Sequence, residues 1–354
     1  MRLLLIAIAL LCGGASAHAE ADHAAIAKVS LTEVIRPGYA GLADAAAALK
    51  GKVDTLCRQR SAATLQEAKD AFASTVAAWS KVEIFRFGPV TAEHRFERLF
   101  FWPDPKGLGL RQIQEALTKQ DATVTDPDQL AGKSVALQGL PALEYLLYGE
   151  DGDLPKADRA FRCSFGLAVA TNVDRIAKQV VEGWRESSAF EKAFLDPAPE
   201  DPYYHAPKEV TLDLFKAFTT GIELVRDQKL GKPLGASPAE AKPKLAAFWR
   251  SGLTFDNAAG NLEGVRALFA QGGFAQVVAQ ESAGVENSIL FDLDHAVEVL
   301  RGIDQPVAEV VKNEDLRAKL EALRVGLKNS AQTAGDMISR GAGLAFGFNA
   351  MDGD

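Results

Sequence analysis

One stretch decides the fold: Gly139-Leu140-Pro141-Ala142-Leu143-Glu144-Tyr145-Leu146-Leu147-Tyr148-Gly149. Pro141 fits the first turn of a helix, and Gly149 fits its end. Apolar side chains occupy nearly every face of that helix, so we predict that it is buried on all sides. Its one carboxylate, Glu144, is therefore expected inside the protein near a helix N-terminus, where an acid needs a partner.

The N-terminus has the pattern of a signal peptide. A short positive start precedes the apolar run 3–11, which is too short to span a membrane, and 17–19 is a small-x-small cleavage site. We expect residues 1–19 to be removed and the mature protein to be exported. Cys12 is a candidate for a lipid anchor, but the bulky Leu11 before it favours a soluble exported protein.

The chain is acidic, and its charge excludes some classes of partner. The sequence has 39 Lys+Arg and 47 Asp+Glu, with a formal net charge of −8 at pH 7. This balance argues against nucleic acid and against an anionic membrane surface as partners. No segment after the N-terminal run resembles a transmembrane helix.

Two cysteines remain after Cys12, namely Cys57 and Cys163. Their spacing is not that of a metal site. In an oxidising compartment a disulfide between them is the default, and it would close a long loop. Two separate buried thiols are the alternative.

Almost every segment has apolar residues at helical spacing, and none shows sustained period-two alternation, so we predict an all-α fold. Between about Asp196 and Pro207 the periodicity stops and prolines accumulate, which is typical of a linker. About 335 mature residues also exceed one usual core. We predict two successive four-helix-bundle-like domains, at 20–200 and 201–354.

One arginine has an unusual predicted position. The apolar stripe of a helix over 62–87 includes Trp79, and Arg86 follows it by seven residues. The two side chains should then share the buried face, where a charge must be paired.

Polar and aromatic residues are concentrated before and within the opening stretch. The predicted ligand-binding residues are Arg86, Arg95, Asp104, Arg111, Gln138 and Glu144. In one interpretation, Arg86 or Arg95 neutralises Glu144 inside a salt-bridge network that Gln138 completes. In a second, arginines and aromatic rings form a pocket for a carboxylate- or phosphate-bearing ligand. In a third, Glu144 and His94 are weak metal-ligand candidates, although hard or borderline ions want several ligands.

Known catalytic patterns are missing from the sequence. It has no phosphate-binding glycine loop, no nucleophile elbow, no paired-cysteine metal motif and no His-Glu-x-x-His. The sequence alone therefore identifies no reaction.

Several segments together resemble the imelysin family. They are Phe85-Arg86-Phe87-Gly88-Pro89, Phe101-Trp102-Pro103-Asp104, Arg111-Gln112, the stretch 138–147, Ser251-Gly252-Leu253-Thr254, Asn261-Leu262 and the ending 347–354. They cover nearly the whole mature chain in order and are most similar to the branch described as predicted periplasmic lipoproteins. The resemblance implies an all-α fold of two four-helix-bundle domains, a periplasmic location and frequent association with iron uptake.

The chain departs from the family at one functional position. The family is named after a proposed metallopeptidase, and its signature is Gly-x-His-x-x-Glu. Gly139 and Glu144 match this signature, but Pro141 stands at the place of the histidine and offers no metal donor. A zinc peptidase normally needs three protein ligands and a polarised water, and the sequence does not display them.

We interpret the protein as a non-enzymatic, imelysin-like periplasmic binding or accessory protein, which the resemblance links to iron acquisition. Its expected ligand is a small anionic or iron-containing molecule, and its expected partners are envelope iron-uptake proteins. Iron or another divalent metal as a cofactor stays open. A metallopeptidase and a structural interaction module without a ligand are the alternatives.

Overall fold

The computed structural model describes residues 21–149 and 160–344, and all regular structure within these ranges is helical. The all-α prediction is therefore confirmed for this part of the chain. No helix there is both long and apolar enough to cross a bilayer. The predicted signal peptide, Cys12 and the ending 347–354 lie outside the described residues.

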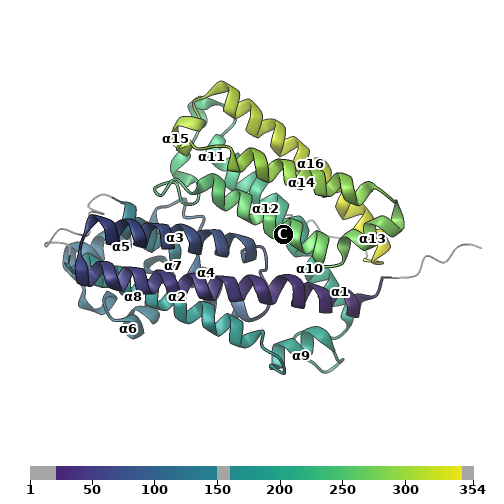
Figure 1. Ribbon diagram of the computed structural model, residues 1–354, viewed down its shortest axis with the longest axis horizontal. Helices are drawn as coiled ribbons and strands as arrows, with labels where there is room; N and C mark the ends of the chain where they lie inside the picture. Colours follow the sequence, from purple (N-terminus) through teal and green to yellow (C-terminus); the bar gives the residue numbers. More distant parts are fainter. Residues whose placement is uncertain (1–20, 150–159, 345–354) are drawn as a thin grey trace, which may run out of the picture.

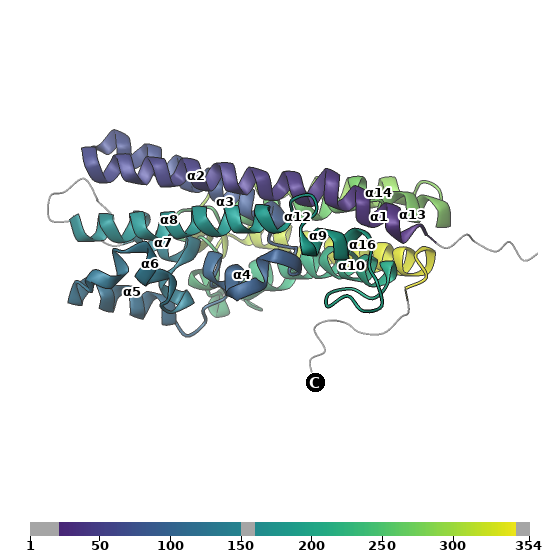
Figure 2. The same ribbon diagram turned by 90° about the horizontal axis from the view of Figure 1, so that it is seen from below.

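The first group of helices is built from α2 (Arg36–Gln59), α3 (Ala62–Val82) and α8 (Ala160–Gly183), which run side by side (Figures 1 and 2). The deciding stretch forms α7 (Gly139–Tyr148), which packs against α8. Its leucines are all fully buried, as the apolar pattern predicts.

The second group consists of α10 (Pro207–Glu223), α12 (Thr254–Gln271), α14 (Val285–Arg301) and α16 (Glu314–Gly341). Packing of α12 on α3 joins this group to the first one (Figure 1). The two groups are compatible with two bundles. The irregular segment 196–206 lies between them in sequence, and the division into domains 20–200 and 201–354 stays a prediction.

Shorter helices connect and cover these groups. They are α4 (Arg95–Leu99), α5 (Leu108–Lys119), α6 (Pro127–Ala131), α9 (Ala189–Leu195), α11 (Lys232–Leu234), α13 (Phe274–Glu281) and α15 (Val307–Val310), with the π-helical segments η1 (Ser30–Ile35) and η7 (Leu224–Gly231).

The first helix of the described chain, α1 (His23–Val29), packs against α10 of the second group. His23 Nδ1 lies 3.0 Å from the hydroxyl of Thr211, which is 188 residues away in sequence. The N-terminal end of the structure is thus held by a helix from the C-terminal half.

The predicted helix over 62–87 is too long. Helix α3 starts at a capping box between Ser61 and Thr64, but it ends at Val82. Because the helix stops there, Arg86 does not continue the buried stripe of Trp79. It is exposed, and its guanidinium carbon lies 4.5 Å from the centre of the Phe96 ring. The prediction that Arg86 is buried is wrong.

The predicted disulfide is confirmed. Cys57 of α2 and Cys163 of α8 are bonded, with their Cα atoms 5.6 Å apart and a separation of 106 positions in sequence. The bond joins two neighbouring helices of the first group, so it restricts the unfolded chain over a long loop.

Removing this disulfide should lower the free energy of unfolding by about 3–5 kcal/mol, because closure of a loop of this length restricts the unfolded state strongly. The double variant Cys57→Ala, Cys163→Ala should show this loss in urea denaturation followed by circular dichroism. Wild-type protein in reducing buffer should behave similarly. An unchanged denaturation midpoint in both cases would mean that the bond contributes nothing to stability.

Candidate functional site

Glu144 lies inside the protein, as the sequence predicts, and is 3 % exposed. It belongs to α7, whose start is fixed by a close approach of two backbones. Gly139 has φ +73°, and a Cβ atom there would lie 2.6 Å from the carbonyl oxygen of Arg98 and would also overlap that of Leu99. The chain can therefore place α7 directly against the end of α4 only with glycine at this position.

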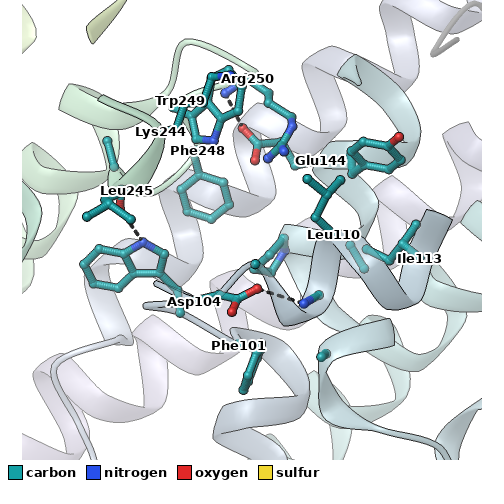
Figure 3. A pocket seen from close by; sticks show the side chains of 18 of the residues that line it. Phe101, Asp104, Leu110, Ile113, Glu144, Lys244, Leu245, Phe248, Trp249 and Arg250 are labelled. Carbon is teal, nitrogen blue, oxygen red and sulfur yellow. Dashed lines mark hydrogen bonds between the residues drawn. The ribbon is translucent and has the colours of Figure 1, made fainter. Parts of the chain in front are cut away.

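The partners of Glu144 come from far along the chain. Its Oε1 accepts hydrogen bonds from the Ser251 amide at 2.9 Å, the Ser251 hydroxyl at 2.8 Å and the Arg250 amide at 3.0 Å. Figure 3 shows the bond from Arg250. The hypothesis that Arg86 or Arg95 neutralises Glu144 is therefore wrong. Backbone amides and a hydroxyl satisfy the carboxylate instead, and sequence spacing gives no sign of a partner 107 residues away.

The surroundings act on the pKa of Glu144 in opposite directions. Burial raises the pKa, because a carboxylate is poorly solvated inside the protein, and this effect prevails. The hydrogen bonds from Ser251 and the positive charge of Arg250 act in the other direction and lower it. Glu144 is thus more easily protonated than an exposed glutamate.

A cavity of about 280 Å³ lies beside Glu144 (Figure 3). Its walls are mainly apolar, include six aromatic side chains and come from segment 100–105, α5, α7 and segment 244–250. The lining residues are Phe100, Phe101, Trp102, Asp104, Pro105, Gly107, Gly109, Leu110, Ile113, Ala136, Pro141, Ala142, Glu144, Tyr145, Lys244, Leu245, Ala246, Phe248, Trp249 and Arg250. An apolar cavity with a few convergent polar groups is the usual form of a small-molecule site.

Backbone strain accompanies this cavity. Phe248 has φ +54°, a left-handed conformation that bulky side chains rarely adopt. The conformation places its buried ring on that of Phe100, with the ring centres 5.1 Å apart. Strained residues of this kind cluster at functional sites.

Only two of the six predicted ligand-binding residues, Asp104 and Glu144, line the cavity. The Asp104 oxygens accept hydrogen bonds from the amides of Leu108 at 2.9 Å and Gly109 at 2.8 Å, at the start of α5. Asp104 therefore fixes a helix terminus as well as forming a wall.

The other four predicted residues lie outside the cavity lining and bind backbone carbonyls or rings. Arg95 donates to Pro89, Arg111 donates to Lys106, and the side-chain amide of Gln138 donates to Lys133. Arg86 contacts Phe96 as described above, and His94 is exposed. Proximity in sequence did not bring these side chains to Glu144.

Sequence reasoning missed the cavity residues of segment 244–250. The cavity lining includes Lys244, Phe248, Trp249 and Arg250. The loop continues into Ser251, whose hydroxyl donates a hydrogen bond to Glu144. Ser251 belongs to one of the segments that resemble the imelysin family. That resemblance was the one available signal, and it gave no indication of the contact with α7.

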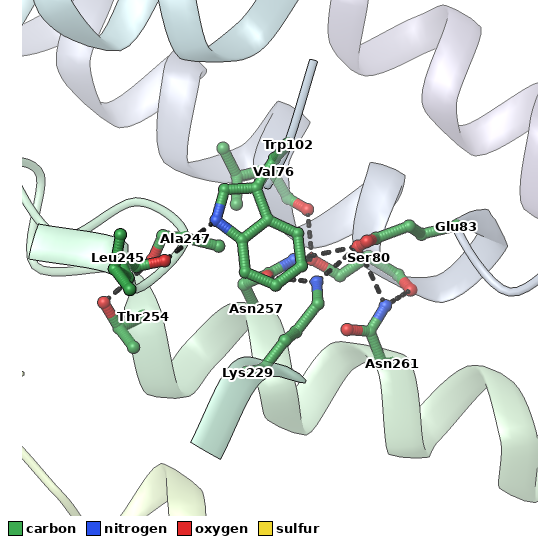
Figure 4. A network of polar contacts seen from close by, with 10 residues as sticks. All are labelled: Val76, Ser80, Glu83, Trp102, Lys229, Leu245, Ala247, Thr254, Asn257 and Asn261. Atoms are coloured by element: carbon green, nitrogen blue, oxygen red, sulfur yellow. Dashed lines mark hydrogen bonds and ion pairs between the residues drawn. The ribbon is translucent and has the colours of Figure 1, made fainter. Parts of the chain in front are cut away.

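A second polar cluster lies under the cavity wall and joins the two groups of helices (Figure 4). Lys229 Nζ, on η7, lies 2.6 Å from Glu83 Oε2 and 2.5 Å from Asn257 Oδ1, and all three side chains are buried. The ammonium also lies 5.4 Å from the ring centres of both Phe100 and Trp102, which line the cavity.

Additional hydrogen bonds fix the acid of this cluster. Asn261 Nδ2 donates to Glu83 Oε2 at 3.0 Å, and Asn257 Nδ2 donates to it at 3.3 Å. Burial lowers the pKa of Lys229 to about 8, and the negative charge of Glu83 limits this decrease.

Metal ligands are sparse. Within residues 21–149 and 160–344, no three or more His, Cys, Asp or Glu side chains are grouped so that they could hold a metal ion. The two predicted metal-ligand candidates do not form a shared site, since Glu144 lines the cavity and the exposed His94 does not.

Comparison with known proteins identifies the family. The imelysin family model matches residues 35–334. The chain belongs to the imelysin family. Its signature glycine and glutamate are Gly139, at the start of α7, and Glu144, at the cavity. The place of the signature histidine is taken by Pro141, which also lines the cavity.

Relatives of this imelysin chain are distant in sequence. Iron-regulated protein A from Synechococcus elongatus is 23% identical over 206 residues, which are 57% of this chain and 52% of that protein. The match thus spans about half of the relative's length.

Two solved structures share the imelysin fold. An imelysin-like protein from Psychrobacter arcticum has a TM-score of 0.75 at 18% identity, with 92% of this chain and 97% of that chain covered. A candidate iron-regulated protein A precursor from Parabacteroides distasonis has a TM-score of 0.74 at 14% identity, with 89% of this chain and 95% of that chain covered.

Proposed function

We propose that this imelysin-family protein is an exported, periplasmic binding or accessory protein whose cavity beside Glu144 holds a small organic ligand. The observation that carries the proposal is the fixing of Glu144 by Arg250 and Ser251 at the wall of an aromatic-lined cavity. Glu144 on α7 and a loop 107 residues later form one site. A salt bridge inside one bundle would not need such a loop beside a cavity.

An iron-related role is part of the proposal and rests on the relatives. Two of them are iron-regulated protein A or its precursor by name. We therefore propose envelope iron-uptake proteins as partners. A metallopeptidase is less well supported, because Pro141 has no donor atom and a zinc centre of that type normally uses three protein ligands.

Filling the cavity should abolish binding without unfolding the protein. Leu110→Trp places an indole in the cavity from α5, and Leu117→Trp adds the same group to the same helix outside the cavity. In a thermal-shift screen with a fragment library, wild type and Leu117→Trp should share a set of stabilising fragments that Leu110→Trp loses. If no fragment distinguishes the three proteins, the cavity is not a binding site and the structural-module alternative is favoured.

Glu144→Gln should weaken binding of those fragments about tenfold while lowering the free energy of unfolding by only about 1 kcal/mol. The amide oxygen of glutamine can still accept the three hydrogen bonds that Oε1 now receives, but the second oxygen and the charge are lost. Calorimetric titration and urea denaturation measure the two effects. Glu144→Leu is the control for a structural loss, since it leaves buried amides without an acceptor and should cost several times more stability. Unchanged binding together with a large stability loss in Glu144→Gln would contradict the proposal.

A further inference from the structure

We propose that the cavity binds an aromatic anion that also carries a hydroxyl group, such as a hydroxyaryl carboxylate. This inference rests on the proposed function and names the class of ligand. It follows from the aromatic rings, the two cations and the acceptor oxygen at the cavity.

The walls and the volume of the cavity favour an aromatic ring system. Phe100 lies between Phe248 and Trp102, with ring centres 5.1 and 5.9 Å away and interplanar angles of 23° and 27°. An engineered apolar cavity of about 150 Å³ holds one benzene ring. The cavity of about 280 Å³ therefore has room for about two fused rings.

Two cations at the cavity take part in no salt bridge of the described residues, although the charge of Arg250 acts on Glu144. The guanidinium carbon of Arg250 lies 4.3 Å from the centre of the Trp249 ring and 5.4 Å from that of Tyr145. Lys244 Nζ lies 5.7 Å from the same Trp249 ring. Among the ion pairs of the described chain, neither Lys244 nor Arg250 takes part in one. Both can therefore pair with a ligand anion.

The two acids at the cavity have little capacity left to accept further hydrogen bonds. Both oxygens of Asp104 already accept amide hydrogen bonds at the start of α5. Glu144 Oε1 accepts three hydrogen bonds, and no donor from residues 21–149 or 160–344 reaches Oε2. A single acceptor oxygen is thus free, and it matches one ligand hydroxyl.

An organic cation fits these groups less well. Aromatic walls can bind a cation, but Lys244 and Arg250 would repel it. The two carboxylates that could oppose this repulsion, Asp104 and Glu144, already accept hydrogen bonds from the protein. The free groups are two cations, one acceptor and several rings. Their complement is a ring that carries a carboxylate and a hydroxyl.

Four naphthalene probes test this assignment by calorimetry at pH 7. They are 6-hydroxy-2-naphthoate, its carboxamide, 2-naphthoate and 2-naphthylmethylamine. We expect 6-hydroxy-2-naphthoate to bind most tightly, the carboxamide to bind at least about tenfold more weakly because it lacks the charge, and 2-naphthoate about fivefold more weakly because it lacks the hydroxyl. The amine should bind most weakly.

Variants identify the groups responsible. The double variant Lys244→Gln, Arg250→Gln should bind 6-hydroxy-2-naphthoate at least about tenfold more weakly and the carboxamide almost as well as wild type does. The matched control is Lys242→Gln, which is exposed two residues before Lys244 and does not line this cavity. Its affinity for all probes should equal that of wild type, and thermal unfolding checks that each variant is folded.

The result separates failure of this inference from failure of the proposed function. If the amine binds best, or if the double variant binds 6-hydroxy-2-naphthoate like wild type, the ligand class is wrong. If no naphthalene binds but library fragments still distinguish Leu110→Trp from Leu117→Trp, the class is wrong and the binding function stands. If neither naphthalenes nor fragments bind, both fail.

Discussion

Lys229→Met should lower the free energy of unfolding by about 3–5 kcal/mol, the typical cost of leaving one member of a buried ion pair without its partner. Glu83 is completely buried and would have only the amides of Asn257 and Asn261 beside it. Urea denaturation followed by circular dichroism measures the loss. Lys216→Met is the control, because Lys216 is 54% exposed, lies 3.4 Å from Asp213 and should change stability by less than about 0.5 kcal/mol.

Adding Glu83→Gln to Lys229→Met should restore much of the lost stability, because the double variant no longer buries an unpaired charge. The interaction energy from the four proteins then measures the coupling of the pair. If the two single effects simply add, Lys229 and Glu83 are not coupled, and the prediction fails.

The same pair should give a defined pH dependence. The pKa of Lys229 is about 8 in the folded protein and about 10.4 in an unfolded chain. Between these values the unfolded chain binds a proton that the folded protein lacks, so the contribution of Lys229 to the unfolding free energy rises with pH. Relative to Lys229→Met, wild type should gain on the order of 1–2 kcal/mol between pH 7.5 and pH 9.5. A difference that stays constant would contradict this pKa shift.

Gly139→Ala should have the second large effect, a loss of about 3 kcal/mol or more in the free energy of unfolding. Alanine is strained at φ +73°, and its methyl group would overlap the backbone carbonyls of Arg98 and Leu99, which cannot move aside as a flexible side chain does. The start of α7 would shift, and Glu144 with it, so fragment binding should weaken as well.

Gly107→Ala is the matched control for this substitution. Gly107 has φ +62°, but an added Cβ would meet nothing within 4 Å. Gly107→Ala should therefore lower the free energy of unfolding by only about 1–2 kcal/mol, which is the conformational cost of alanine at positive φ. Equal losses in Gly107→Ala and Gly139→Ala would show that the backbone contact at Gly139 is not important.

Local features of the fold could be predicted from the sequence. The apolar pattern of 139–148 determines a helix buried on all sides, since every face needs a neighbour. Cys57 and Cys163 were paired because they are the two cysteines that remain after the predicted signal peptide, and the bond is present. The helix over 62–87 was extended too far because periodicity alone does not indicate where α3 ends.

The site was predicted only in part for a different reason. Glu144 was recognised because a carboxylate in an apolar helix is unusual, but its partners are backbone amides and Ser251. Backbone amides carry no sequence signal, and packing between the two groups of helices decides which loop supplies them. For the same reason, Lys244 and Arg250 could not be identified, while Arg86 and Arg95 were included because they are near in sequence.

The packing of α1 on α10 has a consequence for the order of folding. In a chain that crosses a membrane from its N-terminus, α1 emerges early, whereas Thr211 follows His23 by 188 residues. Contacts of such large sequence separation form late, because a long loop must close first. Under the proposed export, α1 therefore enters the periplasm first but keeps its apolar face exposed until α10 has followed. The first helix to be exported is thus among the last to pack.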